Sequence, residues 1–258
     1  MQLAPELHRH AEWTDADVDL RVSVDPVLFR LREGRLHVLL RRRSWEPFIG
    51  VWALPGAINS SGEQIEETMW RELRSLGFGR DLWVEQLKTF DRPPQRVGGR
   101  TVPGRDPRGR VVSVTYFATV PAGATGTTSL PEVEWIPLDE LPPLAFDHRE
   151  IVDYALWRLR NKIQYSPVAF AFLPSEFTLT DLQEVYEAVL GVKLDKRNFR
   201  RKALTDKVVM PTESMSRREK RPARLYRFND RQFSYSPRVA RSGFSENDAE
   251  GATFLASA

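Results

Sequence analysis

Two short helix patterns in the C-terminal third of the chain restrict its fold more than any other feature. The first pattern starts at the capping residue Thr178, repeats apolar residues at helical spacing for about three turns, and ends at Gly191. After three more residues Asp195 offers a second N-cap, for a helix that runs to Leu204. Two helices joined by a short turn that contains glycine form a helix-turn-helix, so residues 178–204 are predicted to adopt that motif.

The second of these helices is expected to read DNA. The N-terminal part of such a helix reaches the base edges of the major groove, where arginine pairs with guanine and asparagine with adenine through two hydrogen bonds each. The predicted DNA-contacting residues are Lys196, Arg197, Asn198, Arg200, Arg201 and Lys202, together with Thr180 in the first helix. Phe199, Ala203 and Leu204 are expected to turn inward.

A basic wing is predicted to follow the helices. The strand-like segments 208–210 and 225–228 bracket a tip that would meet phosphates or a minor groove. The basic tip residues are Arg217, Arg218, Lys220, Arg221 and Arg224.

Charge supports this interpretation. Between Lys193 and Arg227 there are thirteen Lys or Arg and four Asp or Glu, whereas the whole chain has a net charge of only +3. A basic block on an otherwise acidic chain favours a polyanionic partner, here double-stranded DNA. The alternative is a basic helical hairpin that only makes the protein soluble.

Composition excludes several classes of protein. No apolar run approaches the roughly 20 residues of a membrane-spanning helix, and the N-terminus lacks the apolar core of a signal peptide. The chain has no cysteine, which rules out disulfides and thiolate metal sites and fits a reducing compartment. The histidines at positions 8, 10, 37 and 148 lack zinc-ligand spacing and are interpreted as surface or packing residues. A cytoplasmic protein without a membrane partner is expected.

The residues before the helix-turn-helix predict a separate domain of the α/β (α+β) class. Strand patterns are expected at 20–29, 36–40, 51–54, 82–90, 110–120 and 133–137, and helix patterns at 64–76 and 147–164. The order β-β-β-α-β-β-α, with the short strand pattern 133–137 before the last helix, predicts a mixed sheet with helices packed on it. A Gly-, Pro- and Arg-rich loop of about twenty residues precedes position 110, and loops of that length are usually functional or disordered.

The chain therefore divides into four predicted regions. These are a flexible lead-in at 1–17, a mixed-sheet sandwich at 18–166, a winged helix-turn-helix at 167–236 and a disordered tail at 237–258. The boundary near Pro167 is placed where the character of the sequence changes.

The predicted domain at 18–166 is called Nudix-like, because it contains a segment that resembles an incomplete Nudix box. Leu54-Pro55-Gly56 begins it, Glu63 fits its first carboxylate, and Arg71-Glu72-Leu73 follows at the right spacing. The Glu-Glu pair that should come next falls on Ser75 and Leu76, or on Arg74 and Ser75 when counted back from Gly77. Metal-assisted hydrolysis of a diphosphate needs several carboxylates, so Glu63 and Glu72 are at most a weak site for a divalent metal. Hydrolysis is not expected, whereas ligand binding can persist.

Both halves together resemble the Nudix-related transcriptional regulators of NAD metabolism, the NrtR family of bacterial repressors. The resemblance rests on residues 177–183 and 194–202 in the second domain, and on 105–110 followed by 111–116 in the first. It extends over about residues 20–230. The sequence departs from the family's usual loop by an insertion at roughly 97–104, which affects the shape of the ligand pocket.

The resemblance implies that ADP-ribose or a related NAD derivative is the effector, that operators of NAD synthesis or salvage genes are the targets, and that no other cofactor is required. Side-chain chemistry is compatible, because arginines can bind a diphosphate and an aromatic ring can stack on adenine. The predicted ligand-binding residues are Arg43, Trp52, Arg71, Arg105, Asp106 and Arg108, with Phe48 as an alternative ring. Asp106 and Arg108 could equally brace their own loop.

The complete hypothesis is a homodimeric repressor on a pseudo-palindromic operator. On DNA the two recognition helices would lie one DNA turn apart, about 34 Å. ADP-ribose would favour a spacing that no longer matches that distance. Two alternatives stay open. One is an active Nudix hydrolase of ADP-ribose with an accessory nucleic-acid-binding domain, and the other is a nucleic-acid-binding protein whose Nudix fold only dimerises.

Overall fold

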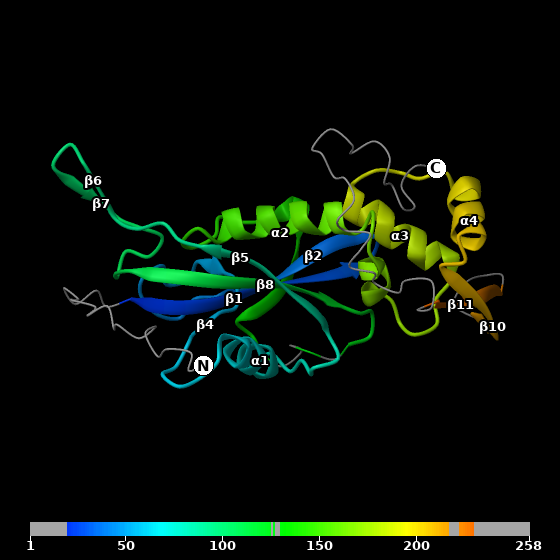
Figure 1. The fold of residues 1–258 in the computed structure, drawn as a ribbon, viewed down its shortest axis with the longest axis horizontal. Coiled ribbons are helices and arrows are strands. Elements are labelled where there is room, and N and C mark those ends of the chain that lie inside the picture. Colours follow the sequence, from blue (N-terminus) through cyan, green and yellow to red (C-terminus); the bar gives the residue numbers. More distant parts are fainter. Residues whose placement is uncertain (1–19, 125, 127–129, 217–221, 230–258) are drawn as a thin grey trace, which may run out of the picture.

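The computed structural model of the protein describes residues 20–124, 126, 130–216 and 222–229. Within these residues a mixed β-sheet carries a helix on each face, and a smaller unit of helices and a hairpin follows it (Figure 1). The predicted class, a mixed-sheet sandwich followed by a winged helix-turn-helix, is confirmed. The predicted lead-in at 1–17 and tail at 237–258 lie outside the described residues.

The central sheet is built around one parallel pair of strands. β1 (Arg21–Arg32) runs parallel to β8 (Val111–Val120), and its other neighbour is the antiparallel β2 (Arg35–Arg42). β5 (Trp83–Phe90) pairs with β8, β3 (Trp52–Ala53) and β9 (Val133–Pro137) pair with β2, and β4 (Ala57–Ile58) pairs with β1. The order β3-β2-β1-β8-β5 places β1 in the middle of the sheet.

A helix covers each face of this sheet (Figure 1). α1 (Ile65–Ser75) buries Met69 and Leu73 in one hydrophobic cluster. On the opposite face α2 (His148–Lys162) buries Ile151, Ala155 and Leu159 in another, and the short 3-10 helix η1 (Leu138–Glu140) precedes it. The two clusters are separated by the sheet, as the alternation of side chains along β1 requires.

The loop before position 110 contains an element that the sequence prediction missed. β6 (Gln95–Val97) and β7 (Arg100–Val102) form an exposed two-stranded hairpin that projects from the body of the domain (Figure 1). Gly98 and Gly99 connect the strands with φ angles of 56° and 78°. Positive φ at both residues of a two-residue loop is the geometry that gives a twisted hairpin, so the Gly-Gly pair was an available signal.

The second unit forms a winged helix. It consists of the 3-10 helix η2 (Pro167–Phe172), α3 (Leu179–Leu190), α4 (Lys196–Thr205), β10 (Val209–Ser216) and β11 (Ala223–Phe228). Both predicted caps are present, because Thr178 Oγ1 accepts a hydrogen bond from Asp181 N at 3.1 Å and Asp195 Oδ1 from Asn198 N at 2.8 Å. Gly191 has the left-handed φ of 72° that ends α3.

The two units share one hydrophobic cluster. Leu182, Val185 and Val189 of α3 are fully buried together with Leu159 of α2 and residues of the sheet. The winged helix is thus packed on the first domain through α2. No helix among the described residues is long and apolar enough to cross a membrane.

Candidate functional site

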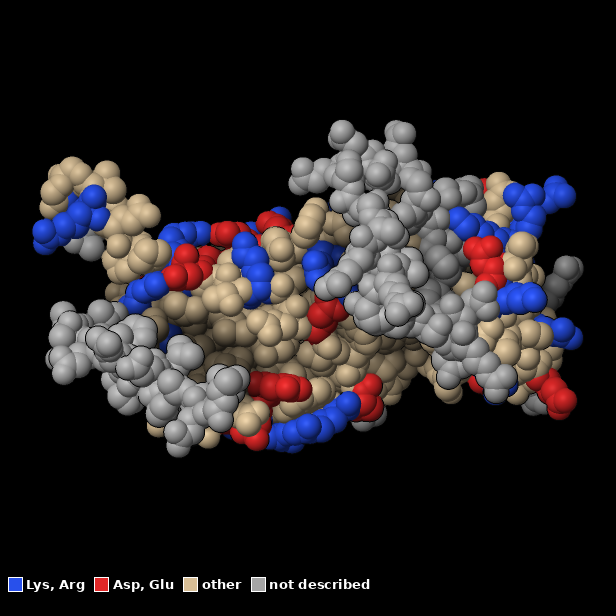
Figure 2. Space-filling model, in the orientation of Figure 1, with Lys and Arg blue, Asp and Glu red and all other residues tan. Residues whose placement is uncertain are grey.

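The recognition helix α4 has one buried and one basic face. Phe199 and Ala203 are fully buried, with the Phe199 ring 5.6 Å from that of Tyr186 in α3. Lys196, Arg197 and Arg201 are exposed, and Lys and Arg side chains gather at the end of the molecule formed by α4 and the wing (Figure 2). An exposed basic helix at one end of a winged helix is suited to enter the major groove of DNA.

One prediction about this helix was wrong, and a second residue has a contact that was not predicted. Leu204, expected to turn inward, is 45% exposed, because the buried stripe of α4 follows positions 199 and 203 and Leu204 lies a further 100° around the helix. Arg200 donates a hydrogen bond from Nη2 to Thr180 Oγ1 at 3.1 Å. It is therefore half-buried against α3, and its guanidinium is less exposed than those of Arg197 and Arg201.

The other predicted DNA-contacting residues are placed as follows. Asn198 and Lys202 are half-buried on the flanks of α4. The wing strands are longer than predicted, and Phe177 pairs with Tyr226 through two backbone hydrogen bonds of 2.9 and 2.8 Å. Arg217, Arg218, Lys220 and Arg221 lie outside the described residues.

A pocket of about 290 Å³ lies in the first domain, at one end of the parallel strand pair. It is lined by residues of β1, the loop after β2, the segment 54–58, the loop 105–108 and the start of α2. Four of the six predicted ligand-binding residues line it, namely Arg43, Arg105, Asp106 and Arg108.

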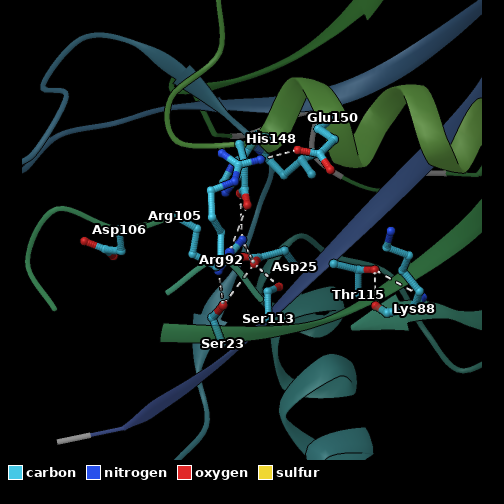
Figure 3. A network of polar contacts seen from close by, with 12 residues as sticks. Ser23, Asp25, Lys88, Arg92, Arg105, Asp106, Ser113, Thr115, His148 and Glu150 are labelled. Atoms are coloured by element: carbon cyan, nitrogen blue, oxygen red, sulfur yellow. Dashed lines mark hydrogen bonds and ion pairs between the residues drawn. The ribbon is translucent and has the colours of Figure 1, made fainter. Parts of the chain in front are cut away.

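The floor of this pocket is a buried polar network (Figure 3). Arg105, with a side chain only 4% exposed, forms two hydrogen bonds to the Asp147 carboxylate, at 3.0 and 2.8 Å, and an ion pair with Asp25 at 3.6 Å. Asp25 also accepts hydrogen bonds from the hydroxyls of Ser23 and Ser113. One cation between two carboxylates leaves one net negative charge in the floor, and the hydrogen bonds from the two serine hydroxyls to Asp25 help to stabilise it.

His148 completes the inner wall of the pocket. Its Nδ1 accepts a hydrogen bond from Leu54 N at 2.9 Å, so this nitrogen carries no proton. Burial lowers the pKa of the imidazole, with the Arg105 charge acting in the same direction. The ring is therefore neutral and carries its proton on Nε2, so this N–H is a hydrogen-bond donor. His148 itself lines the pocket.

The rim combines cations with aromatic rings. The Arg43 guanidinium lies 4.7 Å from the centre of the Phe146 ring and 5.4 Å from that of Trp45, and Arg108 lies 5.8 Å from Phe146. Phe146 has a positive φ of 56°, an unusual conformation for a residue with a side chain. Asp106 holds Arg108 through side-chain bonds of 2.7 and 3.0 Å.

Burial and the Arg108 charge together lower the pKa of Arg43. The two guanidiniums therefore repel each other across the rim. An anion bound between them would relieve that repulsion.

Trp52 and Arg71 do not line the pocket. Trp52 lies in β3, with the Arg42 guanidinium 5.1 Å from its ring centre. Arg71 is bound to Glu63 and donates a hydrogen bond to the backbone oxygen of Ile58 at 3.1 Å, and Ile58 lines the pocket. The rings that line the pocket are Trp45 and Phe146, while Phe48 packs edge-on against Phe146 at 4.9 Å.

The two acids of the Nudix box are engaged by arginines. Glu63 pairs with Arg71 at 2.9 Å, which lowers the pKa of the carboxyl to about 2. Glu72 is buried and pairs with Arg41 of β2 at 2.8 Å, and burial raises its pKa. Among the described residues no group of three or more His, Cys, Asp or Glu could hold a metal ion. Carboxylates neutralised by guanidiniums do not form a suitable donor set for the divalent metal that a Nudix fold implies.

Steric crowding explains why position 56, at the start of the box, is a glycine. A Cβ atom at this position would lie 2.1 Å from Asp25 Oδ1. Glycine therefore makes room for the buried carboxylate of the pocket floor.

The chain was compared with known proteins. Residues 19–155 match the NUDIX domain family, and residues 169–228 match the NrtR DNA-binding winged helix domain. The ADPR responsive transcriptional repressor NtrR of Acinetobacter baylyi is 34% identical over 223 residues, which cover 84% of this chain and 86% of that protein. The ADP-ribose pyrophosphatase of Methanocaldococcus jannaschii is 34% identical over 139 residues, covering 53% of this chain and 74% of that protein.

A solved structure agrees with the sequence relatives. The crystal structure of Shewanella oneidensis NrtR complexed with a 27mer DNA is similar with a TM-score of 0.70 and 33% identity, over 83% of this chain and 96% of that chain. The chain therefore belongs to the NrtR family, in which a Nudix domain is joined to a DNA-binding winged helix domain.

Proposed function

We propose that this protein is a transcriptional repressor that binds operator DNA through α4 and the wing and responds to ADP-ribose bound in the pocket of the Nudix domain. The observation that carries the effector part is the pocket rim, where the guanidiniums of Arg43 and Arg108 both lie near the Phe146 ring. Two cations that repel each other in the free protein favour a ligand with two or more negative charges. A diphosphate has that charge, and arginine binds it with charge-assisted hydrogen bonds.

The rest of the pocket suits the remaining parts of ADP-ribose. Trp45 and Phe146 provide rings against which adenine can stack. On the floor, Ser23, Asp25 and the His148 Nε2–H offer acceptors and a donor to ribose hydroxyls. The relatives support the same ligand, because the Acinetobacter baylyi repressor is described as ADPR responsive.

DNA recognition is proposed to follow the usual geometry of this motif. Arg197 and Arg201 would read base edges, Lys196 and the wing would contact phosphates, and Thr180 would position Arg200. A homodimer on a pseudo-palindromic operator would place two recognition helices about 34 Å apart. The proposed targets are genes of NAD synthesis or salvage, as the family resemblance implies. The protein is proposed to act on them in the cytoplasm.

The direct test is DNA binding by the full chain with and without ADP-ribose. A fluorescence-anisotropy titration would use the tightest duplex that the protein selects from a random-sequence pool. Selective binding that weakens in saturating ADP-ribose is the expected result. Equal affinity in both conditions would remove the effector from the function, and equal affinity for selected and random duplexes would remove operator recognition.

A second candidate function is hydrolysis of ADP-ribose, favoured by the likeness of residues in the first domain to an ADP-ribose pyrophosphatase. Against it, Glu63 and Glu72 are paired with arginines, and the positions of the missing acids hold Ser75 and the fully buried Leu76. We infer that the domain binds without turnover. Release of AMP from ADP-ribose in the presence of millimolar Mg²⁺ or Mn²⁺ would overturn this inference, and unchanged ADP-ribose would support it.

A further inference from the structure

α2 is in contact with both functional sites. Its first residue, His148, lines the pocket, and its last turns pack against α3. At about 1.5 Å per residue, the fifteen residues of this helix span about 22 Å. A straight helix of this length moves as a unit, so a displacement at one end is felt at the other.

The N-terminal end of α2 is held by the pocket floor. Asp147, the residue before the helix, accepts both hydrogen bonds from Arg105, and His148 accepts one from Leu54 N. Arg105, His148 and Leu54 all line the pocket. A ligand that contacts these groups therefore acts directly on the start of α2.

The C-terminal end of α2 reaches the turn of the helix-turn-helix. Arg160 donates a hydrogen bond from Nε to Val189 O at 2.9 Å, in the last turn of α3, where carbonyls lack partners within the helix. The Arg160 guanidinium also lies against the C-cap of α3, since a Cβ on Gly191 would be 3.6 Å from its Nη2. A cation at this helix end is favourable for the helix dipole as well.

The turn beyond Gly191 follows α3 closely. Glu187 of α3 accepts hydrogen bonds from Leu194 N at 3.0 Å and from Lys193 Nζ at 2.7 Å, and Gln183 donates to Leu194 O at 3.0 Å. Asp195, the next residue, caps α4. Any shift at the end of α3 is therefore passed to the start of the recognition helix.

We propose that α2 couples the pocket to the DNA-reading helix, and that Arg160 is the positioning residue through which it acts. The proposal rests on the proposed function. Arg160 contacts neither the pocket nor the exposed face of α4, so its removal separates coupling from binding. Ligand binding in the pocket shifts α2 through Arg105 and Asp147, and Arg160 carries the shift to the turn before α4.

The test uses the full chain with Arg160→Ala and Arg160→Lys. Three quantities are measured: the Kd for ADP-ribose by calorimetry, the Kd for the selected duplex without effector, and the ratio of DNA Kd values with and without saturating ADP-ribose. In Arg160→Ala the two separate Kd values stay within about threefold of the wild type. The ratio falls several-fold towards one, from a coupling of the usual size, about 5- to 150-fold. Arg160→Lys, which keeps a donor and the charge, retains part of the ratio.

Arg158→Ala is the matched control. Arg158 lies two residues earlier on α2 and pairs with Glu85 of β5 at 3.2 Å, so its ion pair is with the sheet. This variant keeps the wild-type ratio. A wild-type ratio in Arg160→Ala, or an equal loss in Arg158→Ala, would overturn the role of Arg160 while leaving the proposed function intact.

Two further outcomes decide between the proposals. A ratio of one in the wild type would overturn the proposed function and the coupling with it. If Arg160→Ala does not fold, as judged by its circular dichroism, the ratio is measured in Arg160→Lys and Arg160→Gln instead. Arg160→Gln loses the charge, so a wild-type ratio in this variant counts against the proposal.

Discussion

On α4 the arginines at positions 197 and 201 are exposed, whereas Arg105 in the Nudix domain is buried between Asp25 and Asp147. The same residue type thus serves two purposes. An exposed guanidinium contributes little to stability and is free to bind a phosphate or a base. A buried guanidinium offsets the negative charge of the carboxylates around it and so stabilises the structure of the pocket. Substitutions should therefore separate the two regions, one changing stability and the other DNA binding.

The largest effect is expected from Arg105→Met. It leaves two buried carboxylates without their cation, which should lower the free energy of unfolding by about 3 to 5 kcal/mol. Urea denaturation at pH 7 measures this. Arg149→Ala is the control, because Arg149 pairs with Asp153 one turn along α2 and both side chains are more than half exposed, and it should lose less than about 1 kcal/mol. Similar losses in both variants would contradict the distinction between buried and exposed arginines.

Next in size is Arg197→Ala in the recognition helix. Removing an exposed base-reading side chain should weaken binding to the selected duplex by about 1 to 3 kcal/mol and relax base preference. Stability should change by less than about 0.5 kcal/mol. Anisotropy with selected and random duplexes measures the first effect and urea denaturation the second. If the affinity for random DNA falls by the same factor, Arg197 contacts phosphates and does not read bases.

Arg43→Ala sharpens the comparison inside the pocket itself. Loss of one of the two rim cations should weaken ADP-ribose binding by about 1.5 kcal/mol, roughly tenfold, as for a hydrogen bond to a charged group. Calorimetry measures the Kd. Arg96→Ala, on the exposed β6–β7 hairpin, should leave it unchanged. An unchanged Kd in Arg43→Ala would mean that the ligand does not lie between the rim arginines.

The smallest effect is a pH dependence at His148. Burial lowers the pKa of this imidazole, so below about pH 6.5 the unfolded chain binds a proton that the folded protein does not. The contribution to stability is complete above that pH and is lost as pH falls, by at most about 1.4 kcal/mol for each pH unit.

The comparison variant for this pH effect is His148→Asn, whose Oδ1 can accept the hydrogen bond from Leu54 N without titrating. The difference in stability between pH 7.5 and 5.5 (about one unit on each side of the unfolded pKa) should be smaller in the variant. Equal slopes in both proteins would show that His148 does not titrate in this window.

Local signals account for what the sequence predicted well. Thr178 and Asp195 cap their helices because capping depends on residues three positions apart. The inward face of α4 was misjudged at Leu204, because the phase of a short helix depends on what it packs against.

The pocket was predictable only in part. Arg43, Arg105 and Arg108 were identified because cations in loops stand out, whereas Trp45 and Phe146 look like any core aromatics in a sequence. The position of Phe146 depends on a positive φ that nothing in the sequence announces. Asp25 was missed although a charged residue within an apolar strand is a sign of a buried polar contact. His148 was interpreted as a packing residue, yet it lines the pocket.

Gly56 shows that a residue of a motif can be constrained by a contact outside that motif. Its place in the sequence suggests a loop shaped for metal and diphosphate, but in this protein the space of a side chain is taken by the Asp25 carboxylate. Mutational drift can alter the acids of the box one at a time, while any side chain at Gly56 pushes Asp25 away from Arg105. Motif scoring would count this glycine towards catalysis, although the structure constrains it through a contact that belongs to the pocket floor.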